Sequence, residues 1–142
     1  MILDSQNTFC TAISVARTVG DAVSTDVYDT GAAADVGIGE NFYVYAKMDA
    51  ALAGAGASIQ VVLQDSADNS TFADAESGKV VALAAATANA ELARLRAPIG
   101  LRRYLRVAFR ISGATTSGGT ASAMLVKDVQ AQQYGASGFS VA

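Results

Sequence analysis

The residues of this chain that could do chemistry are a few paired carboxylates, one thiol and a row of arginines. Asp26 with Asp29, and Asp65 with Asp68, could be proposed as acid pairs for glycoside chemistry, but nothing in the sequence places either pair across a cleft. The chain contains no histidine, which removes the commonest general base and every Ser–His or Cys–His arrangement. We therefore expect a protein that is not an enzyme and has no catalytic residues.

Metal and cofactor sites have equally little support in the sequence. Cys10 is the single cysteine, so no zinc site and no internal disulfide can be built, and its neighbour Phe9 predicts a buried, inert thiol. The segment from Asp65 to Ser70 faintly resembles a calcium loop but lacks its glycine and closing glutamate, so we predict a turn closed by Asx hydrogen bonds. The glycines near Gly37 match no complete nucleotide-binding motif. We expect no metal and no cofactor.

The remaining feature is the run from Arg102 to Ser112, whose chemistry alternates residue by residue. This period of two predicts a β-strand with two unlike faces. Burial of four apolar side chains contributes roughly 1.5–3 kcal/mol each, so we expect the apolar face to lie in the core. That face carries Leu105, Val107, Phe109 and Ile111, and the opposite face carries Arg102, Tyr104, Arg106, Ala108 and Arg110.

The cationic face has two interpretations. It is either a solvated outer face, with the Arg and Tyr stems packed flat on the sheet, or a surface that meets a partner. Residues 1–40 hold six acids and one arginine, whereas residues 94–110 hold six arginines and no acid, so the arginines could neutralise the N-terminal region of their own chain or of a neighbouring subunit. Nucleic acid is a weaker candidate partner, because the net charge is -3 and only one predicted strand is basic.

Further segments alternate in the same way and are separated by turns rich in glycine and small polar residues. With 142 residues and a single proline, the chain is expected to form one domain, an all-β, two-sheet antiparallel sandwich, of which a jelly roll is one form. The additional predicted strands are Asn41–Asp49, Ser58–Asp65 and Ser122–Val129.

The alanine-rich stretch from Val80 to Ala97 is harder to interpret. Its composition has high intrinsic helix propensity, but Pro98 would end any helix near Ala97 and the apolar stripe is thin. We favour two strands, Lys79–Leu83 and Leu92–Ala97, over a short helix or a flexible loop in the segment Ala82–Ala90.

Both ends of the chain are predicted to lie outside the sandwich. Residues 1–10 show no sustained period and predict an extended N-terminal arm with Ile2, Leu3 and Phe9 as anchors, and residues 131–142 predict a C-terminal tail. The start lacks a basic region, and no run approaches the roughly 20 apolar residues of a membrane span. We therefore expect no signal peptide and no membrane contact, and a product made and used inside the cell or built into a particle there.

Six segments carry a further resemblance and together cover most of the sequence: Met1–Phe9, Val23–Gly31, Phe42–Ala46, Val61–Phe72, Arg103–Val107 and Thr120–Gln130. In order and spacing they resemble the Bbp16-like capsid cement proteins of Bordetella phage. The resemblance implies a jelly-roll sandwich that is made in the host bacterial cytoplasm, decorates the exterior of a tailed-phage capsid and bridges subunits of the major capsid protein, often as a dimer. It implies no catalytic residues, and the alanine-rich Ala82–Ala90 departs from the shorter, more polar loop that it leads us to expect.

On this basis we expect a structural virion protein that cements a capsid. An alternative is a carbohydrate- or receptor-binding sandwich of a phage tail or fibre, with Tyr43 and Tyr45 as a stacking platform, although cross-strand packing is the commoner use of such a pair. The candidate interface, which would meet acidic or apolar patches on the capsid or on a second copy, comprises Arg102, Tyr104, Arg106, Arg110, Ile2, Leu3 and Phe9.

Overall fold

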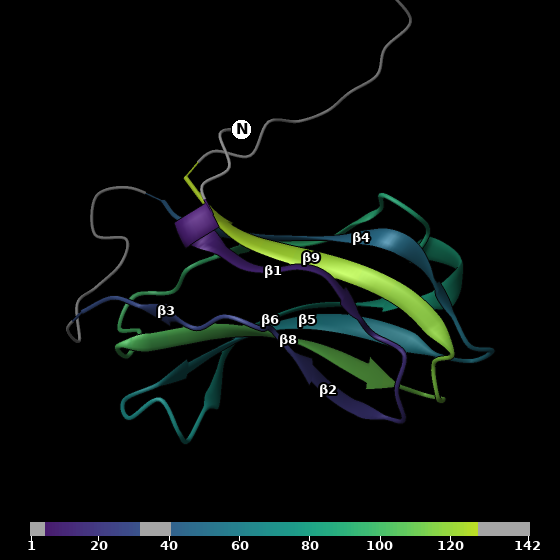
Figure 1. The fold of residues 1–142 in the computed structure, drawn as a ribbon, viewed down its shortest axis with the longest axis horizontal. Helices are drawn as coiled ribbons and strands as arrows, with labels where there is room; N and C mark the ends of the chain where they lie inside the picture. The colour runs from purple at the N-terminus through teal and green to yellow at the C-terminus, as the bar shows by residue number, and fades with distance from the viewer. Residues whose placement is uncertain (1–4, 32–40, 128–142) are drawn as a thin grey trace, which may run out of the picture.

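A computed structural model describes residues 5–31 and 41–127, which form two antiparallel sheets packed face to face (Figure 1). Sheet A has the strand order β1 (Thr8–Ser14), β9 (Gly118–Val126), β4 (Tyr43–Ala53), β7 (Glu91–Arg96). Sheet B has the order β2 (Gly20–Val23), β8 (Tyr104–Ser112), β5 (Ser58–Ser66), β6 (Ala73–Ala82), and β3 (Tyr28–Asp29) also pairs with β8. Two short 3-10 turns, η1 (Ser5–Asn7) and η2 (Leu83–Ala85), complete the described elements.

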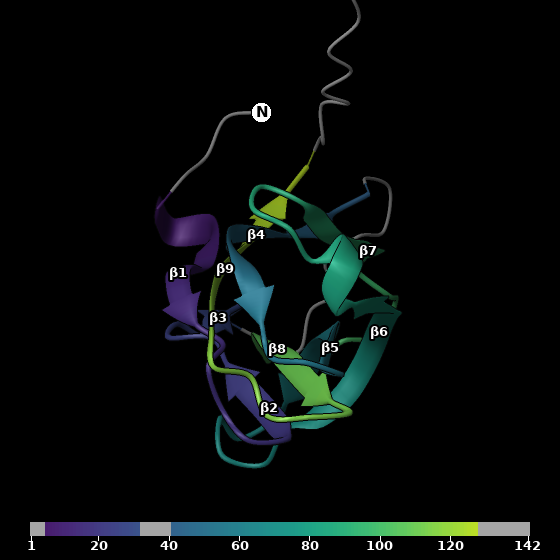
Figure 2. The ribbon, with the colours of Figure 1, turned by 90° about the vertical axis from the view of Figure 1, so that its right-hand side faces the viewer.

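The chain passes repeatedly between the sheets, so that β1 and β2 form one lateral side of the sandwich and β6 and β7 form the other (Figure 2). The predicted two-sheet antiparallel sandwich is thereby confirmed. If β2 and β3 are counted as one interrupted strand, each sheet has four strands, and from this order we infer the jelly-roll subtype. No helix in the described ranges is long and apolar enough to cross a membrane.

The core lies between the sheets and follows the predicted alternation. In β8, the side chains of Leu105, Val107, Phe109 and Ile111 are all 0–1% exposed. They meet the inward faces of β5 and β4, whose alternate residues are also buried: Ile59, Val61, Leu63, Val44, Ala46 and Met48. Each of these three strands was identified correctly from its period of two, because one of its faces is fully apolar.

The alanine-rich stretch forms strands, as predicted. The first strand, β6, begins earlier than expected, at Ala73, and the second is β7. Between them the chain makes the 3-10 turn η2, which is followed by the buried Ala86 and does not continue as a helix. The last predicted strand, Ser122–Val129, is shifted towards the N-terminus. The observed strand, β9, begins at Gly118 and ends at Val126.

The predicted arm over residues 1–10 is wrong for its last three residues. They belong to β1, which pairs with β9, and Phe9 and Cys10 are 2% and 1% exposed in the core. Register shifts interrupt this pairing, and Ala12 has a φ of 48°, so the strand lacks the simple alternation that would identify it. Ile2 and Leu3, and the predicted tail over 131–142, lie outside the described residues.

Candidate partner-binding surface

The outer face of sheet B carries the arginine row. Arg106 and Arg110 point away from the core residues of β8, and Arg110 stands opposite Asp21 of β2 and Gln60 of β5. Ala108, between the two arginines, is fully buried even though it lies on the outer face. The long side chains therefore cover the sheet surface beneath them, as the solvated-face interpretation requires.

Arg110 binds two carboxylates from two different strands. Its guanidinium donates to both oxygens of Asp21 in β2, at 2.8 and 2.9 Å, and to both oxygens of Asp74 in β6, at 2.8 and 3.2 Å. Such paired, charge-assisted hydrogen bonds fix the guanidinium plane. Arg110 thus connects β8 to β2 on one side and reaches across β5 to β6 on the other.

Arg106 extends the same network. Its Nε donates to the side-chain oxygen of Gln64 at 2.8 Å, and the amide nitrogen of Gln64 donates to Asp74 at 2.8 Å. The guanidinium of Arg106 lies over the ring of Phe72, 3.9 Å from its centroid. We call this chain of contacts the sheet B network (Asp21, Arg110, Asp74, Gln64 and Arg106). Each of its five residues has a polar partner within the molecule.

Two more arginines precede β8 and bind acids of their own chain. Arg102 donates to Asp65 at 2.6 Å, and Arg103 donates to both oxygens of Asp29 at 2.7 and 2.9 Å. Arg103 also lies 4.9 Å from the ring centroid of Tyr104. Arg103 and Arg110 therefore neutralise acids of the N-terminal region of the same chain. The charge distribution had left open whether these acids would come from the same chain or from a neighbouring subunit.

The acids in these contacts are stabilised as carboxylates. Hydrogen bonds from Arg110 and then from Gln64 lower the pKa of Asp74 below its ordinary value of 3.8. The hydrogen bond from Arg102 does the same for the pKa of Asp65, and Arg103 lowers the pKa of Asp29 to about 2. The pKa of Arg110 is raised in turn, first by Asp21 and then by Asp74.

The structure thus separates the predicted interface residues into three groups. Arg102, Arg106 and Arg110 are engaged within the chain, and Tyr104 is half-buried beside Arg103. Phe9 is a core residue of β1 and is not available to a partner. Ile2 and Leu3 lie outside the described residues. The charge distribution predicted partners among the six acids of residues 1–40, which include Asp21 and Asp29. No sequence signal identified Asp74 or Gln64.

The predicted turn after β5 is present. The carboxylate of Asp68 accepts hydrogen bonds from the backbone of Ser70 and Thr71, at 3.0 and 2.9 Å, and from the hydroxyl of Ser66 at 2.8 Å. These bonds lower the pKa of Asp68 to about 2, with the Thr71 backbone contributing most. Within residues 5–31 and 41–127, no cluster of three or more acids or thiols has the geometry to hold a metal ion.

Burial raises the pKa of the Cys10 thiol from 9.0 to about 11. The side chain is enclosed in the core, as its neighbour Phe9 suggested. The predicted inert thiol therefore agrees with its surroundings in the fold.

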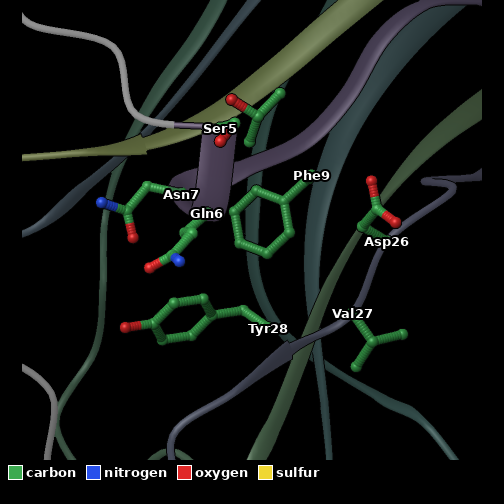
Figure 3. A pocket seen from close by; sticks show the side chains of 8 residues that line it. Ser5, Gln6, Asn7, Phe9, Asp26, Val27 and Tyr28 are labelled. Atoms are coloured by element: carbon green, nitrogen blue, oxygen red, sulfur yellow. The ribbon is translucent and has the colours of Figure 1, made fainter.

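A small pocket of about 200 Å³ lies where η1 and the start of β1 approach β3. Figure 3 shows the side chains of Gln6, Phe9 and Tyr28 gathered on one side of it, with Asp26 and Val27 on the other. Of the two acids considered as a pair, Asp26 lines this pocket, whereas Asp29 does not line it and is held by Arg103.

The outer face of sheet A carries Tyr43 and Tyr45, both half-buried. Tyr43 lies opposite Arg96 of β7, and Tyr45 lies opposite Arg94. On their other side the two tyrosines pair with β9. The tyrosines are thus cross-strand neighbours of arginines within a sheet, which is the commoner use of such a pair.

A second hollow, of about 470 Å³, lies beside the edge strands β6 and β7. It is lined by Glu76 and by residues 94–99. Sequence analysis did not identify it, because it depends on how the edges of the two sheets come together.

The described part of the chain is therefore a small antiparallel β-sandwich, and ion pairs within the chain connect the strands on the outer face of sheet B. Residues 9–125, most of the chain, match the family model Bbp16, and the chain belongs to the Bbp16 family. It is accordingly a phage structural protein and a component of the virion. No curated protein matches the sequence.

Proposed function

We propose that this protein cements the exterior of a tailed-phage capsid by bridging neighbouring subunits of the major capsid protein. The observation that carries the proposal is the match to the Bbp16 family over nearly the whole sandwich, residues 9–125. The chain is expected to act as a homo-oligomer, with a dimer favoured by the family resemblance, and without nucleic acid or membrane as a partner.

The physical properties of the sandwich suit this function. A protein that bridges subunits under pressure from inside a capsid has to keep its shape, and the sheet B network links β2, β8, β5 and β6 by charge-assisted hydrogen bonds. Many copies on one particle also multiply weak individual contacts. Rigidity and copy number can thus replace the strong single site that an enzyme or receptor requires.

The arginine row has a structural role in this proposal. Because Arg110 already binds Asp21 and Asp74, a capsid partner would have to displace internal carboxylates before it gained a contact. We therefore assign Arg102, Arg106 and Arg110 to the stability of the sandwich. The adhesive surface has to be sought where the described side chains lack internal partners.

Binding to heads that lack this protein tests the proposal. The purified protein is mixed with such heads, the particles are sedimented, and the bound protein is measured over a range of concentrations. We expect saturable binding at a fixed ratio to the major capsid protein. Failure to bind heads, together with binding to host glycans on an array, would instead favour the carbohydrate- or receptor-binding alternative.

A further inference from the structure

The groove beside β7 differs chemically from the rest of the described surface. It lies at the edge of both sheets, since β6 is the last strand of sheet B and β7 is the last strand of sheet A. Its apolar part is formed by Leu95, Ala97 and the half-buried Pro98. Its volume is about 470 Å³. Ligand-binding pockets typically have volumes of about 300–1,000 Å³.

The groove also contains the most exposed large apolar side chain in the described ranges. Ile99 is 71% exposed, compared with 60% for Val19 and 56% for Val80. An isolated exposed apolar residue needs no explanation, but Ile99 lines a groove whose floor is also apolar. Covering it would remove apolar surface from water on both sides of a contact.

Two charged side chains of the groove lack internal partners. Among the arginines that the structure describes, Arg96 is the one with neither a hydrogen bond nor an ion pair, and Glu76 likewise has neither. The arginines of β8, by contrast, are all engaged. An unpaired cation and an unpaired anion, supplied by β7 and β6, thus line the same apolar groove.

We propose that this groove receives a polypeptide segment of the partner that carries an apolar side chain between an acid and a base. The apolar side chain would cover Ile99, the acid would pair with Arg96, and the base would pair with Glu76. This inference rests on the proposed function, in that the segment belongs to the major capsid protein.

A polypeptide fits these groups better than the other classes of ligand. A nucleic acid would bring its phosphates towards Glu76, and a neutral sugar would leave both charges unpaired. A segment with both signs of charge satisfies both groups, whereas a segment that places like charges beside Arg96 and Glu76 is disfavoured.

The test compares two double variants in the head-binding assay. Arg96→Glu with Ile99→Asp alters the groove. Arg17→Glu with Val19→Asp makes the same change of charge and also replaces an exposed apolar side chain, in the connection between β1 and β2 on the opposite lateral side of the sandwich. We expect the groove variant to lose at least tenfold in apparent affinity and the control variant to bind like the wild type. Unfolding midpoints equal to the wild type confirm that both variants are folded.

A third variant tests the order of charges. Exchanging the two charges, Glu76→Arg with Arg96→Glu, keeps the net charge of the groove, and we expect it to weaken binding as well. Equal binding by the wild type and the groove variant would overturn the groove assignment, whereas no binding by the wild type would overturn the proposed function itself. A groove variant that becomes monomeric while the wild type is dimeric would show that the occupant is a second copy, which also overturns the proposal.

Discussion

Arg110 in β8 lies directly opposite Asp21 in β2, and its guanidinium donates to both carboxylate oxygens at 2.8 and 2.9 Å. The same guanidinium holds both oxygens of Asp74 in β6. One side chain thus joins three strands of sheet B on its outer face. Arg110, which the sequence placed on a candidate partner-binding face, is therefore engaged by two carboxylates of its own chain.

Replacing Arg110 with methionine should destabilise the protein. The substitution keeps most of the stem that covers Ala108 but leaves Asp21 and Asp74 without their shared cation. Because the Arg110 side chain is about one-third exposed, we expect a loss of about 1–2 kcal/mol in the free energy of unfolding, measured by urea denaturation.

Arg94→Met is the matched control for this substitution. Arg94 forms an ion pair with Glu91, three residues away on the edge strand β7, and both side chains are more than one-third exposed, so its loss should cost less than about 0.5 kcal/mol. Equal unfolding midpoints for Arg110→Met and the wild type would contradict a stabilising role for the sheet B network.

Stability should fall in acid. The pKa values of Asp74 and Asp65 are lowered in the fold below 3.8, and those of Asp29 and Asp68 to about 2, so the folded state binds these protons less readily than the unfolded chain does. The contribution of these acids is complete above their unfolded pKa and is lost as pH falls through the folded pKa values, from about 4 to 2.

Thermal unfolding midpoints measured from pH 6 to pH 2 check this dependence. We expect a nearly constant midpoint down to about pH 5 and a steep decline below pH 4. The decline should be shallower in Arg110→Met, because Asp74 then loses the hydrogen bonds from Arg110 that contribute most to its lowered pKa. A midpoint that does not change between pH 5 and pH 2 would exclude the carboxylate contacts as a source of stability.

Phe9→Ala should be severely destabilising, because Phe9 is a core residue and not part of an arm. Truncation of a buried phenylalanine costs about 3–5 kcal/mol. Phe72→Ala provides the comparison, since Phe72 is half-buried beneath Arg106 and its loss should cost about 1 kcal/mol. If Phe9→Ala unfolds at the same urea concentration as the wild type, then β1 does not anchor in the core.

The sequence predicted those strands whose two faces differ at every residue. The run from Leu105 to Ile111 could be assigned to the core because strict alternation has only one explanation in a sandwich. β1 was missed because register shifts between Thr8, Cys10 and Ile13 place two consecutive residues, Phe9 and Cys10, in the core.

The partners of the arginines were predicted only as far as charge alone allowed. The surplus of acids in residues 1–40 indicated six candidates, and Asp21 and Asp29 are two of them. Asp74 could not be found, because β6 pairs with β5 in a register that is irregular at two points. Asp74 lies level with Gln64 and Arg110 lies level with Gln60, so Arg110 reaches Asp74 diagonally across β5. The groove at Ile99 likewise depends on how the edges of two different sheets, β6 of sheet B and β7 of sheet A, come together.

The thiol of Cys10 should react slowly in the folded protein. Burial raises its pKa from 9.0 to about 11, so at pH 8 the folded protein holds almost no thiolate. We expect labelling by a thiol reagent to be at least about tenfold slower than in urea-unfolded protein. Rapid, stoichiometric labelling at pH 8 without denaturant would show that β1 does not enclose this side chain.

The same raised pKa predicts a loss of stability in alkali. The unfolded chain releases the thiol proton above about pH 9, whereas the folded chain retains it to about pH 11. Stability should therefore decline as pH rises through this interval. Cys10→Ala should decline less over the same interval, and an identical decline in both proteins would show that the thiol does not contribute.

The most direct measurement for this account is a cryo-electron-microscopy map of heads lacking the protein, recorded after saturation with the purified wild-type chain. The account predicts sandwich-sized density at regular positions on the outer surface, each copy touching at least two subunits of the major capsid protein. An outer surface that stays bare at saturating concentration, or copies that each touch a single subunit, would contradict it.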